Sequence, residues 1–194
     1  MEVAALVALL GLAGTVGSLV YLHLAPTGLS PIQNPVSQYG ITPYRGGYRA
    51  ATLAFALAGA GLLWALVQGG IGGRLELVAL GVFVLARAAI SWFPMDAPDA
   101  PRTATGRWHG VLAAAAFVGI ALAAQHLRAG VASAALAGFA GPSRLLGLGM
   151  AACLLLMVLV GRSSAGAPRS FGAVERVFYV LAIVWSVLLA AALL

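Results

Sequence analysis

The sequence predicts an all-α polytopic membrane protein, a bundle of six transmembrane helices in one domain (residues 1–194) with both termini on the same side. Hydrophobic residues make up 62% of the 194 residues and charged residues only 8%, whereas soluble domains carry about 25% charged residues. In addition, six stretches are apolar over the roughly 20 residues that a helix needs to cross the hydrocarbon core. A water-soluble fold could not bury so much apolar surface.

The six apolar stretches alternate with connections of unequal length. They cover residues 3–24, 47–67, 75–93, 108–127, 144–161 and 172–194. The first connection (residues 25–46) and the third (94–107) hold seven of the nine prolines. Proline fixes φ and disfavours helix in the preceding residue, so both connections are expected to be ordered and extended. The fourth, residues 128–143, is rich in Ala and Gly and is expected to be a loop.

An even number of spans places the first, third and fifth connections at one end of the bundle, which we call the loop end. Six arginines lie there and three at the opposite end: Arg45, Arg49, Arg102, Arg107, Arg162 and Arg169 against Arg74, Arg128 and Arg144. Cytoplasmic loops of membrane proteins carry an excess of basic residues. The count therefore favours a cytoplasmic loop end.

The net charge of +6 comes with eleven arginines and no lysine. The arginines form no basic run with interleaved aromatic residues, so nucleic acid is not expected as a partner. Interfacial arginines instead suit contact with the phosphates of membrane lipids. The sequence lacks the spacings of zinc sites and nucleotide-binding loops, so no metal and no cofactor are expected. A haem held by His23 and His109 is a weaker alternative.

The unusual polar side chains gather at the loop end. Arg87 precedes Pro94 by seven residues, about 10 Å below the interface at 1.5 Å per residue. It either snorkels past Ser91 or faces an anionic partner inside the bundle. Glu175 and Arg176 open the sixth span, and adjacent helical residues cannot face each other. An ion pair between Glu175 and Arg87 is therefore expected, with a structural role or a role in a ligand site.

Three groups of residues are candidates for a site. Proton transfer would fall to Asp96, His109 and Glu175, and negative charge would be held by Arg87, Arg107 and Arg176. Polar residues of the first connection could cover a pocket: Asn34, Ser37 and Tyr39. Each has a structural alternative: Asp96 as a turn or cap residue, His109 as an interfacial anchor beside Trp108, and the first connection as a loop that satisfies its own backbone.

Four short motifs follow one another at this end: Asn34-Pro-Val-Ser-Gln-Tyr-Gly40, Phe93-Pro-Met-Asp96, Gly106-Arg-Trp-His109 and Gly172-Ala-Val-Glu-Arg176. Their order resembles the "domain of unknown function 998" family of prokaryotic six-helix membrane proteins, although Gln38 stands where the family pattern has Asp. The resemblance implies the fold, a prokaryotic inner (cytoplasmic) membrane, and the site residues named above. It implies no established reaction.

The expected function is a polar pocket at the loop end that binds, and could process, an anionic lipid or another amphiphile such as a polyprenyl or quinone compound. Membrane lipids are then the partners. The alternative is a non-catalytic accessory subunit with a membrane-complex partner, or a homo-oligomer. A transporter is a weaker alternative, because no line of polar residues continues through the other half of the bundle.

Overall fold

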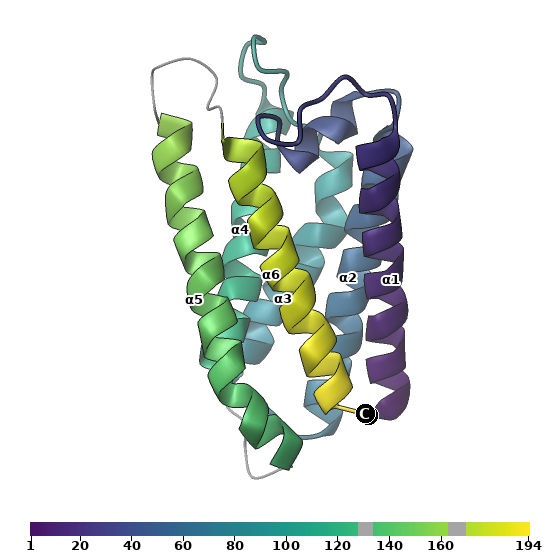
Figure 1. The fold of residues 1–194 in the computed structure, drawn as a ribbon, viewed down its shortest axis with the longest axis vertical. Coiled ribbons are helices and arrows are strands. Elements are labelled where there is room, and N and C mark those ends of the chain that lie inside the picture. The colour runs from purple at the N-terminus through teal and green to yellow at the C-terminus, as the bar shows by residue number, and fades with distance from the viewer. Residues whose placement is uncertain (128–133, 163–169) are drawn as a thin grey trace.

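The computed structural model describes residues 1–127, 134–162 and 170–194. Figure 1 shows six long helices: α1 (Glu2–Leu24), α2 (Arg45–Gln68), α3 (Arg74–Ala89), α4 (Ala104–His126), α5 (Ala134–Arg162) and α6 (Phe171–Ala192). Two short 3-10 helices, η1 (Val36–Ile41) and η2 (Ile90–Trp92), lie at the loop end. Five of these helices, and α3 together with η2 (Arg74–Trp92), are long and apolar enough to span a membrane, and the described residues form no strand. The prediction of an all-α, six-helix membrane protein is confirmed.

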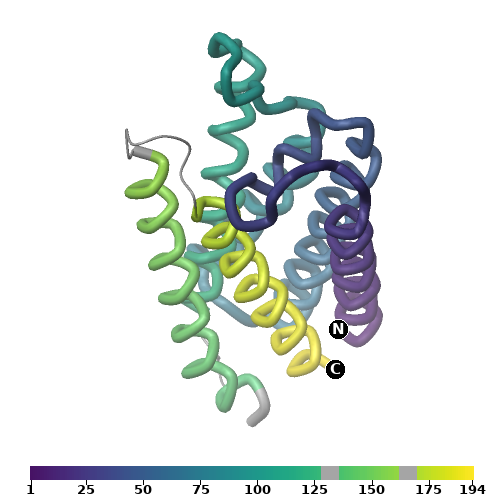
Figure 2. Tube along the Cα trace, turned by 45° about the horizontal axis from the view of Figure 1, so that its top comes forward, coloured from purple at the N-terminus to yellow at the C-terminus, as the bar shows by residue number. Residues whose placement is uncertain are grey.

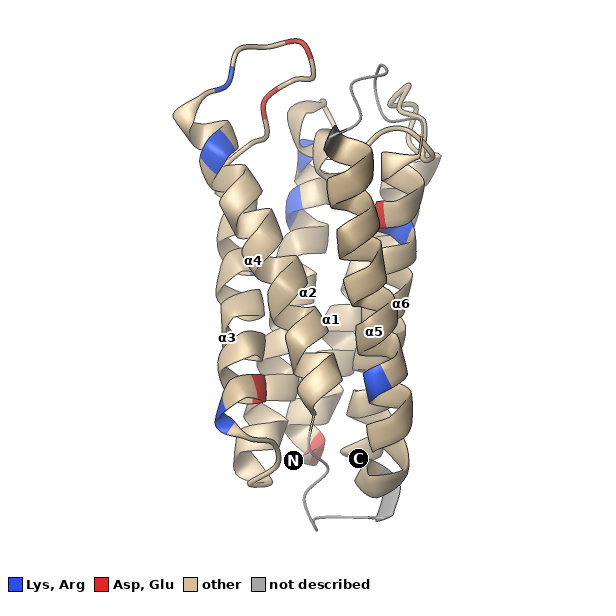
Figure 3. Cartoon of the chain, turned by 90° about the vertical axis from the view of Figure 1, so that its left-hand side faces the viewer, with Lys and Arg blue, Asp and Glu red and all other residues tan. Residues whose placement is uncertain are grey.

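The helices follow one another around the bundle in chain order, and α6 returns to lie beside α1 (Figure 2). The two termini lie together opposite the loop end, and charged residues lie mainly toward the two ends of the bundle (Figure 3). Glycines allow a close crossing of α1 and α2. A Cβ at Gly11 of α1 would lie 2.5 Å from the backbone nitrogen of Ala58, and one at Gly61 of α2 would lie 2.7 Å from the carbonyl oxygen of Ala4. Such contacts let helices associate closely in lipid.

Two helix starts differ by four residues or more from those expected. Helix α4 begins at Ala104 and not at residue 108, because the Thr103 hydroxyl caps it by accepting a hydrogen bond from the Gly106 amide. Helix α5 begins at Ala134, so the expected loop over residues 134–143 is wrong. Pro142 lies inside this helix, which membrane helices tolerate when neighbours satisfy the freed backbone groups.

The start of α5 is held to its neighbours by a buried hydrogen-bond chain. The Ser143 hydroxyl donates to the carbonyl of Ala124 (2.6 Å) and accepts from the indole Nε1 of Trp185 (2.8 Å), which joins α4, α5 and α6.

Of the arginines counted for orientation, Arg128 and Arg169 lie outside the described residues, as does the side chain of Arg162. The cytoplasmic orientation of the loop end stays a prediction.

Candidate functional site

Loop 1, which we define as residues 25–44, is docked on the start of α6. The Glu175 carboxylate is buried and accepts a hydrogen bond from the amide of Val36, the first residue of η1, at 2.7 Å. The Ala173 amide donates to the carbonyl of Ile32 (2.9 Å), and Arg176 Nη1 donates to the carbonyl of Asn34 (2.8 Å). A carboxylate at a helix start accepts hydrogen bonds from free amides and interacts favourably with the positive end of the helix dipole. Glu175 is therefore a cap for η1.

Arg176 joins three parts of the chain. Its Nε donates to Nε2 of His23 in α1 at 2.7 Å, and its Nη1 also donates to the carbonyl of Gly172 at 3.0 Å. Its Nη2 lies 3.5 Å from the hydroxyl of Tyr39, a buried residue of η1. Arg176, which the sequence predicted to bind a ligand, is thus hydrogen-bonded to neutral acceptors and holds parts of the loop end together.

Arg87 is 2% exposed, and its Nη1 donates to the hydroxyl of Tyr179 at 2.9 Å. Its guanidinium carbon lies 5.4 Å from the centre of the Tyr179 ring and 5.6 Å from that of Phe55, within cation–π range. Its Nε is buried without a hydrogen-bond partner. The expected pair of Arg87 with Glu175 is wrong, because the Glu175 carboxylate is turned to the amide of Val36.

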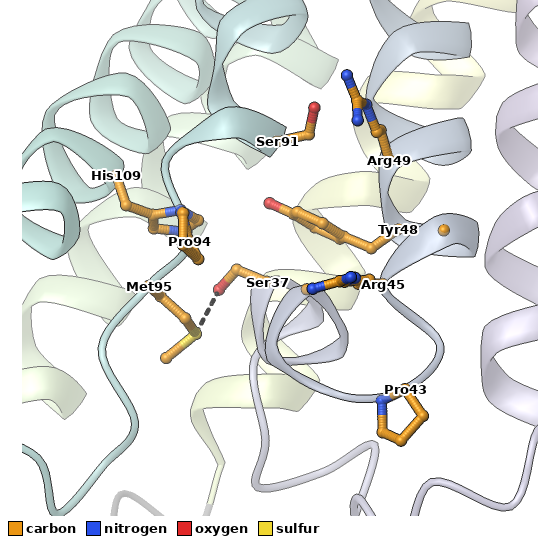
Figure 4. Close-up of a pocket in the computed structure, with 11 residues that line it drawn as sticks. Ser37, Pro43, Arg45, Tyr48, Arg49, Ser91, Pro94, Met95 and His109 are labelled. Carbon is orange, nitrogen blue, oxygen red and sulfur yellow. Dashed lines mark hydrogen bonds between the residues drawn. The ribbon is translucent and has the colours of Figure 1, made fainter.

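A pocket of about 480 Å³ opens at the loop end between the start of α2, η1, η2 and the start of α4 (Figure 4). It is lined by Ser37, Gly40, Pro43, Arg45, Gly46, Tyr48, Arg49, Ser91, Pro94, Met95 and His109. Arg45 and Arg49 are one turn apart on α2, so both charges lie on the same helix face. Neither Asp nor Glu is among these lining residues. The pocket is therefore electropositive.

Two further polar groups in the pocket wall have unused hydrogen-bonding capacity. The Ser91 hydroxyl is buried without a hydrogen-bond partner. His109 is buried, and its Nδ1 lies 2.7 Å from the carbonyl oxygen of Phe93. Because a carbonyl only accepts, Nδ1 carries the hydrogen, which leaves Nε2 of the neutral ring as an acceptor. The pocket wall thus combines cationic groups with a free hydroxyl and a histidine.

Asp96 is placed outside this pocket, in loop 3 (residues 93–103). Its carboxylate accepts from the Thr103 hydroxyl (2.6 Å) and from the Thr103 amide (3.0 Å). These two hydrogen bonds hold the pKa of Asp96 below its ordinary value. A Cβ at Gly106 would overlap this carboxylate. Asp96 closes loop 3 onto the start of α4, the structural role that the sequence left open.

Apart from Arg87 and Asp96, the predicted site residues separate into three sets. Ser37 and His109 line the pocket, and Ser37 also contacts the sulfur of Met95 in loop 3 at 3.2 Å. Loop 1 is shaped by the residues that hold it in place: Asn34, Tyr39, Glu175 and Arg176. Asn34 accepts from the amide of Ser30 and donates to Gln38. Arg107 is exposed and lines a separate hollow on the outer side of loop 3.

Sequence reasoning missed Arg45, Tyr48 and Arg49 as pocket residues. A signal existed for the two arginines. Arg45 is the first residue of α2 and Arg49 follows one turn later, although cations at a helix N-terminus are disfavoured by the helix dipole. The position of these two arginines at the helix start therefore indicated a role other than stabilising the helix. Arg49 lies with its guanidinium carbon 4.1 Å above the ring of Trp92, which fixes its direction.

A bis-histidine haem does not fit the residues present. Nδ1 of His23 is bonded to the carbonyl of Leu19 (2.7 Å) and Nε2 accepts from Arg176, so both ring nitrogens are occupied. Within residues 1–127, 134–162 and 170–194, no three His, Cys, Asp or Glu side chains are grouped to hold a metal ion.

Comparison with known proteins gives a match to a protein family. No curated protein and no solved structure matches the chain significantly. The family model described as "Protein of unknown function (DUF998)" matches residues 4–192, nearly the whole length. The motifs on which the resemblance rested lie in loop 1, in loop 3 and at the starts of α4 and α6, the same segments that build the loop end. The chain therefore belongs to the DUF998 family of membrane proteins.

Proposed function

We propose that the protein binds the phosphate-bearing headgroup of an anionic lipid, or of a similar amphiphile, in the pocket at the loop end. The observation that carries the proposal is the pairing of Arg45 and Arg49 on one wall of a concave site lined by no carboxylate. Guanidinium groups bind phosphate through charge-assisted hydrogen bonds, often two at a time. Two of them, one turn apart, suit a phosphate monoester or diester.

A buried arginine behind the pocket, Arg87, also favours an anionic ligand. Arg87 lies four residues before Ser91, about one turn deeper in the membrane. Its charge is buried with a hydroxyl and two aromatic rings as partners, and its Nε is unsatisfied. Buried cations are costly unless paired. A ligand anion close to Ser91 would lessen that cost by placing negative charge above Arg87.

The depth of the pocket supports an amphiphile and not a freely soluble anion. Trp92 packs against Arg49 of the pocket wall, and Trp108 directly precedes the lining residue His109; they are 52% and 57% exposed. Tryptophan is enriched where membrane helices meet the lipid headgroups. The pocket would then sit at the level of lipid phosphates. If the protein also performs a reaction, His109 is the lining residue suited to general acid–base catalysis.

The proposal is tested by counting bound phosphatidylglycerol on purified protein with native mass spectrometry, at several lipid concentrations. In the double variant Arg45→Gln/Arg49→Gln we expect the affinity of one lipid to fall by at least 100-fold. Two charge-assisted contacts contribute about 3 kcal/mol together at the low end of their range, and about 1.4 kcal/mol corresponds to a factor of ten.

The matched control is Arg74→Gln. Arg74 is also an exposed arginine at the first residue of a helix, α3, but it lies at the opposite end of the bundle. It should leave binding unchanged. Unchanged affinity in the double variant would sink the proposal, as would equal binding of zwitterionic phosphatidylcholine. A stable protein partner that occupies the pocket in place of lipid would favour the accessory-subunit alternative, which stays a prediction.

A further inference from the structure

A second hollow lies on another side of the bundle, between α1 and α6. It is a groove of about 440 Å³ with almost wholly apolar walls. Its lining residues are Val16, Leu19, Val20, His23 and Leu24 of α1, and Arg176, Tyr179, Val180, Ile183 and Val184 of α6. None of them lines the pocket described above. From Val16 to His23 the groove follows the helix axis for about 10 Å, the direction of a lipid acyl chain.

The end of the groove nearest the loops carries a positive charge. A guanidinium has five N–H donors, and Arg176 uses them on a histidine nitrogen, two carbonyls and, at 3.5 Å, a hydroxyl. All four acceptors are neutral, and one N–H of Nη2 remains available for another acceptor. The carboxylate of the adjacent Glu175 is committed to the amide of Val36. The charge of Arg176 is therefore not neutralised by a direct ion pair.

We propose that this groove binds one acyl chain of an anionic phospholipid, whose phosphate accepts a hydrogen bond from Arg176 Nη2. The apolar walls match the chain, and the cation at the groove's mouth matches the phosphate. A polar mouth above apolar walls is the arrangement that an amphiphile requires. The site is independent of the pocket that contains Arg45 and Arg49, and it extends the proposed function to a second, lipid-facing site.

The composition of the walls favours a chain over a helix of a partner protein. Helix–helix interfaces in membranes are enriched in small residues that allow backbones to approach. Seven of the ten lining residues are valine, leucine or isoleucine, and none is glycine, alanine or serine. The contact length of about 10 Å corresponds to only two helical turns. A flexible chain fits between such side chains without close approach of two backbones.

The experiment again counts bound lipid by native mass spectrometry, with phosphatidylglycerol as the probe. Val180→Trp adds bulk to the groove wall at a position that is 58% exposed, so the helix packing is left intact. We expect the affinity of one phosphatidylglycerol to fall at least tenfold, while the lipid held by Arg45 and Arg49 is retained. Val118→Trp on the exposed face of α4, outside both sites, is the matched control and should change neither.

The groove and the pocket can be tested separately because the effects should add. The wild type is expected to hold two tightly bound lipids, each set of substitutions to remove one, and the combination to remove both. Unchanged binding in Val180→Trp overturns the groove proposal but leaves the pocket proposal standing. Phosphatidylcholine held as tightly as phosphatidylglycerol in the groove also overturns it, because this would indicate bulk lipid without recognition of charge. A stoichiometric partner protein displaced by Val180→Trp would overturn it as well.

Discussion

Replacing Gly172 with alanine is expected to detach loop 1 from helix α6. A Cβ at this position would lie 2.7 Å from the carbonyl oxygen of Pro31 and still closer to that of Asn34. Ordinary van der Waals contact begins at about 3.4 Å, so the loop backbone must move by roughly 0.7 Å or more. A neighbouring hydrogen bond of 2.9 Å, from the Ala173 amide to the carbonyl of Ile32, would lengthen to about 3.6 Å, beyond the useful range.

The energetic effect follows from the hydrogen bonds at that edge. One is neutral, and two involve a charged group: Val36 to Glu175, and Arg176 to Asn34. Neutral bonds contribute about 0.5–1.5 kcal/mol each and charged ones about 1.5–3. Against this, alanine stabilises a helix over glycine by about 1 kcal/mol. We expect a net loss of about 2.5–6.5 kcal/mol in the free energy that holds the loop closed.

Hydrogen–deuterium exchange measures this loss directly at η1. A loss of 3 kcal/mol corresponds to about a 100-fold fall in amide protection, which a peptide containing the Val36 amide should show. Gly46→Ala is the matched control, because Gly46 is likewise the second residue of its helix and has no atom within 4 Å of the added Cβ. It should leave the protection of η1 unchanged. Wild-type protection of η1 in Gly172→Ala would refute the reasoning.

Three further predictions concern other contacts of the bundle. Asp96→Asn should increase proteolysis of loop 3 at neutral pH. Because the pKa of Asp96 is lowered, wild-type loop 3 should stay protected at every pH above the ordinary value of 3.8 and lose protection only below it. Equal cleavage of the wild type and the variant at pH 7 would contradict the role of Asp96 in closing loop 3. Tyr179→Phe should lower thermal stability in detergent by about 1–3 kcal/mol, since Arg87 then loses its hydroxyl partner. Arg87→Met should cost less, because an apolar side chain needs no partner there; the reverse order in a melting experiment would count against a buried unpaired cation. Ser143→Ala should cost about 1–3 kcal/mol and alter tryptophan fluorescence, since the indole of Trp185 loses its acceptor; an unchanged melting curve and spectrum would show that this bond contributes nothing.

The positions of the spans could be predicted because hydrophobicity over some 20 residues is a strong local signal. The start of α5 could not. Residues 134–143 are rich in small residues and contain Pro142, features that indicate a break in a soluble protein. In the bundle they remain helical, and their packing partners, such as Trp185, come from distant parts of the chain. Local composition carries no trace of these partners.

The loop end was predicted as the place of the site, but not the roles of its residues. Glu175 and Val36 are 139 residues apart, and neither segment contains a local sequence signal for a carboxylate that caps η1. Once that contact forms, Glu175 and Arg176 hold loop 1 in place, and the cationic side chains of the pocket come from α2. The two arginines of α2 were recognised only as charges that set orientation. Their placement at a helix start was the available signal for more.

The docking of loop 1 on α6 also has a consequence for how the protein is made. Loop 1 follows the first helix, whereas its acceptors and donors, from Gly172 to Arg176, begin the last one. During synthesis the first helix and loop 1 emerge more than a hundred residues before their anchor. The loop end can therefore take its final shape only after the sixth helix has entered the bilayer. A chain that stops before α6 would lack the residues on which loop 1 docks. The folded loop end therefore forms only in a chain that includes α6.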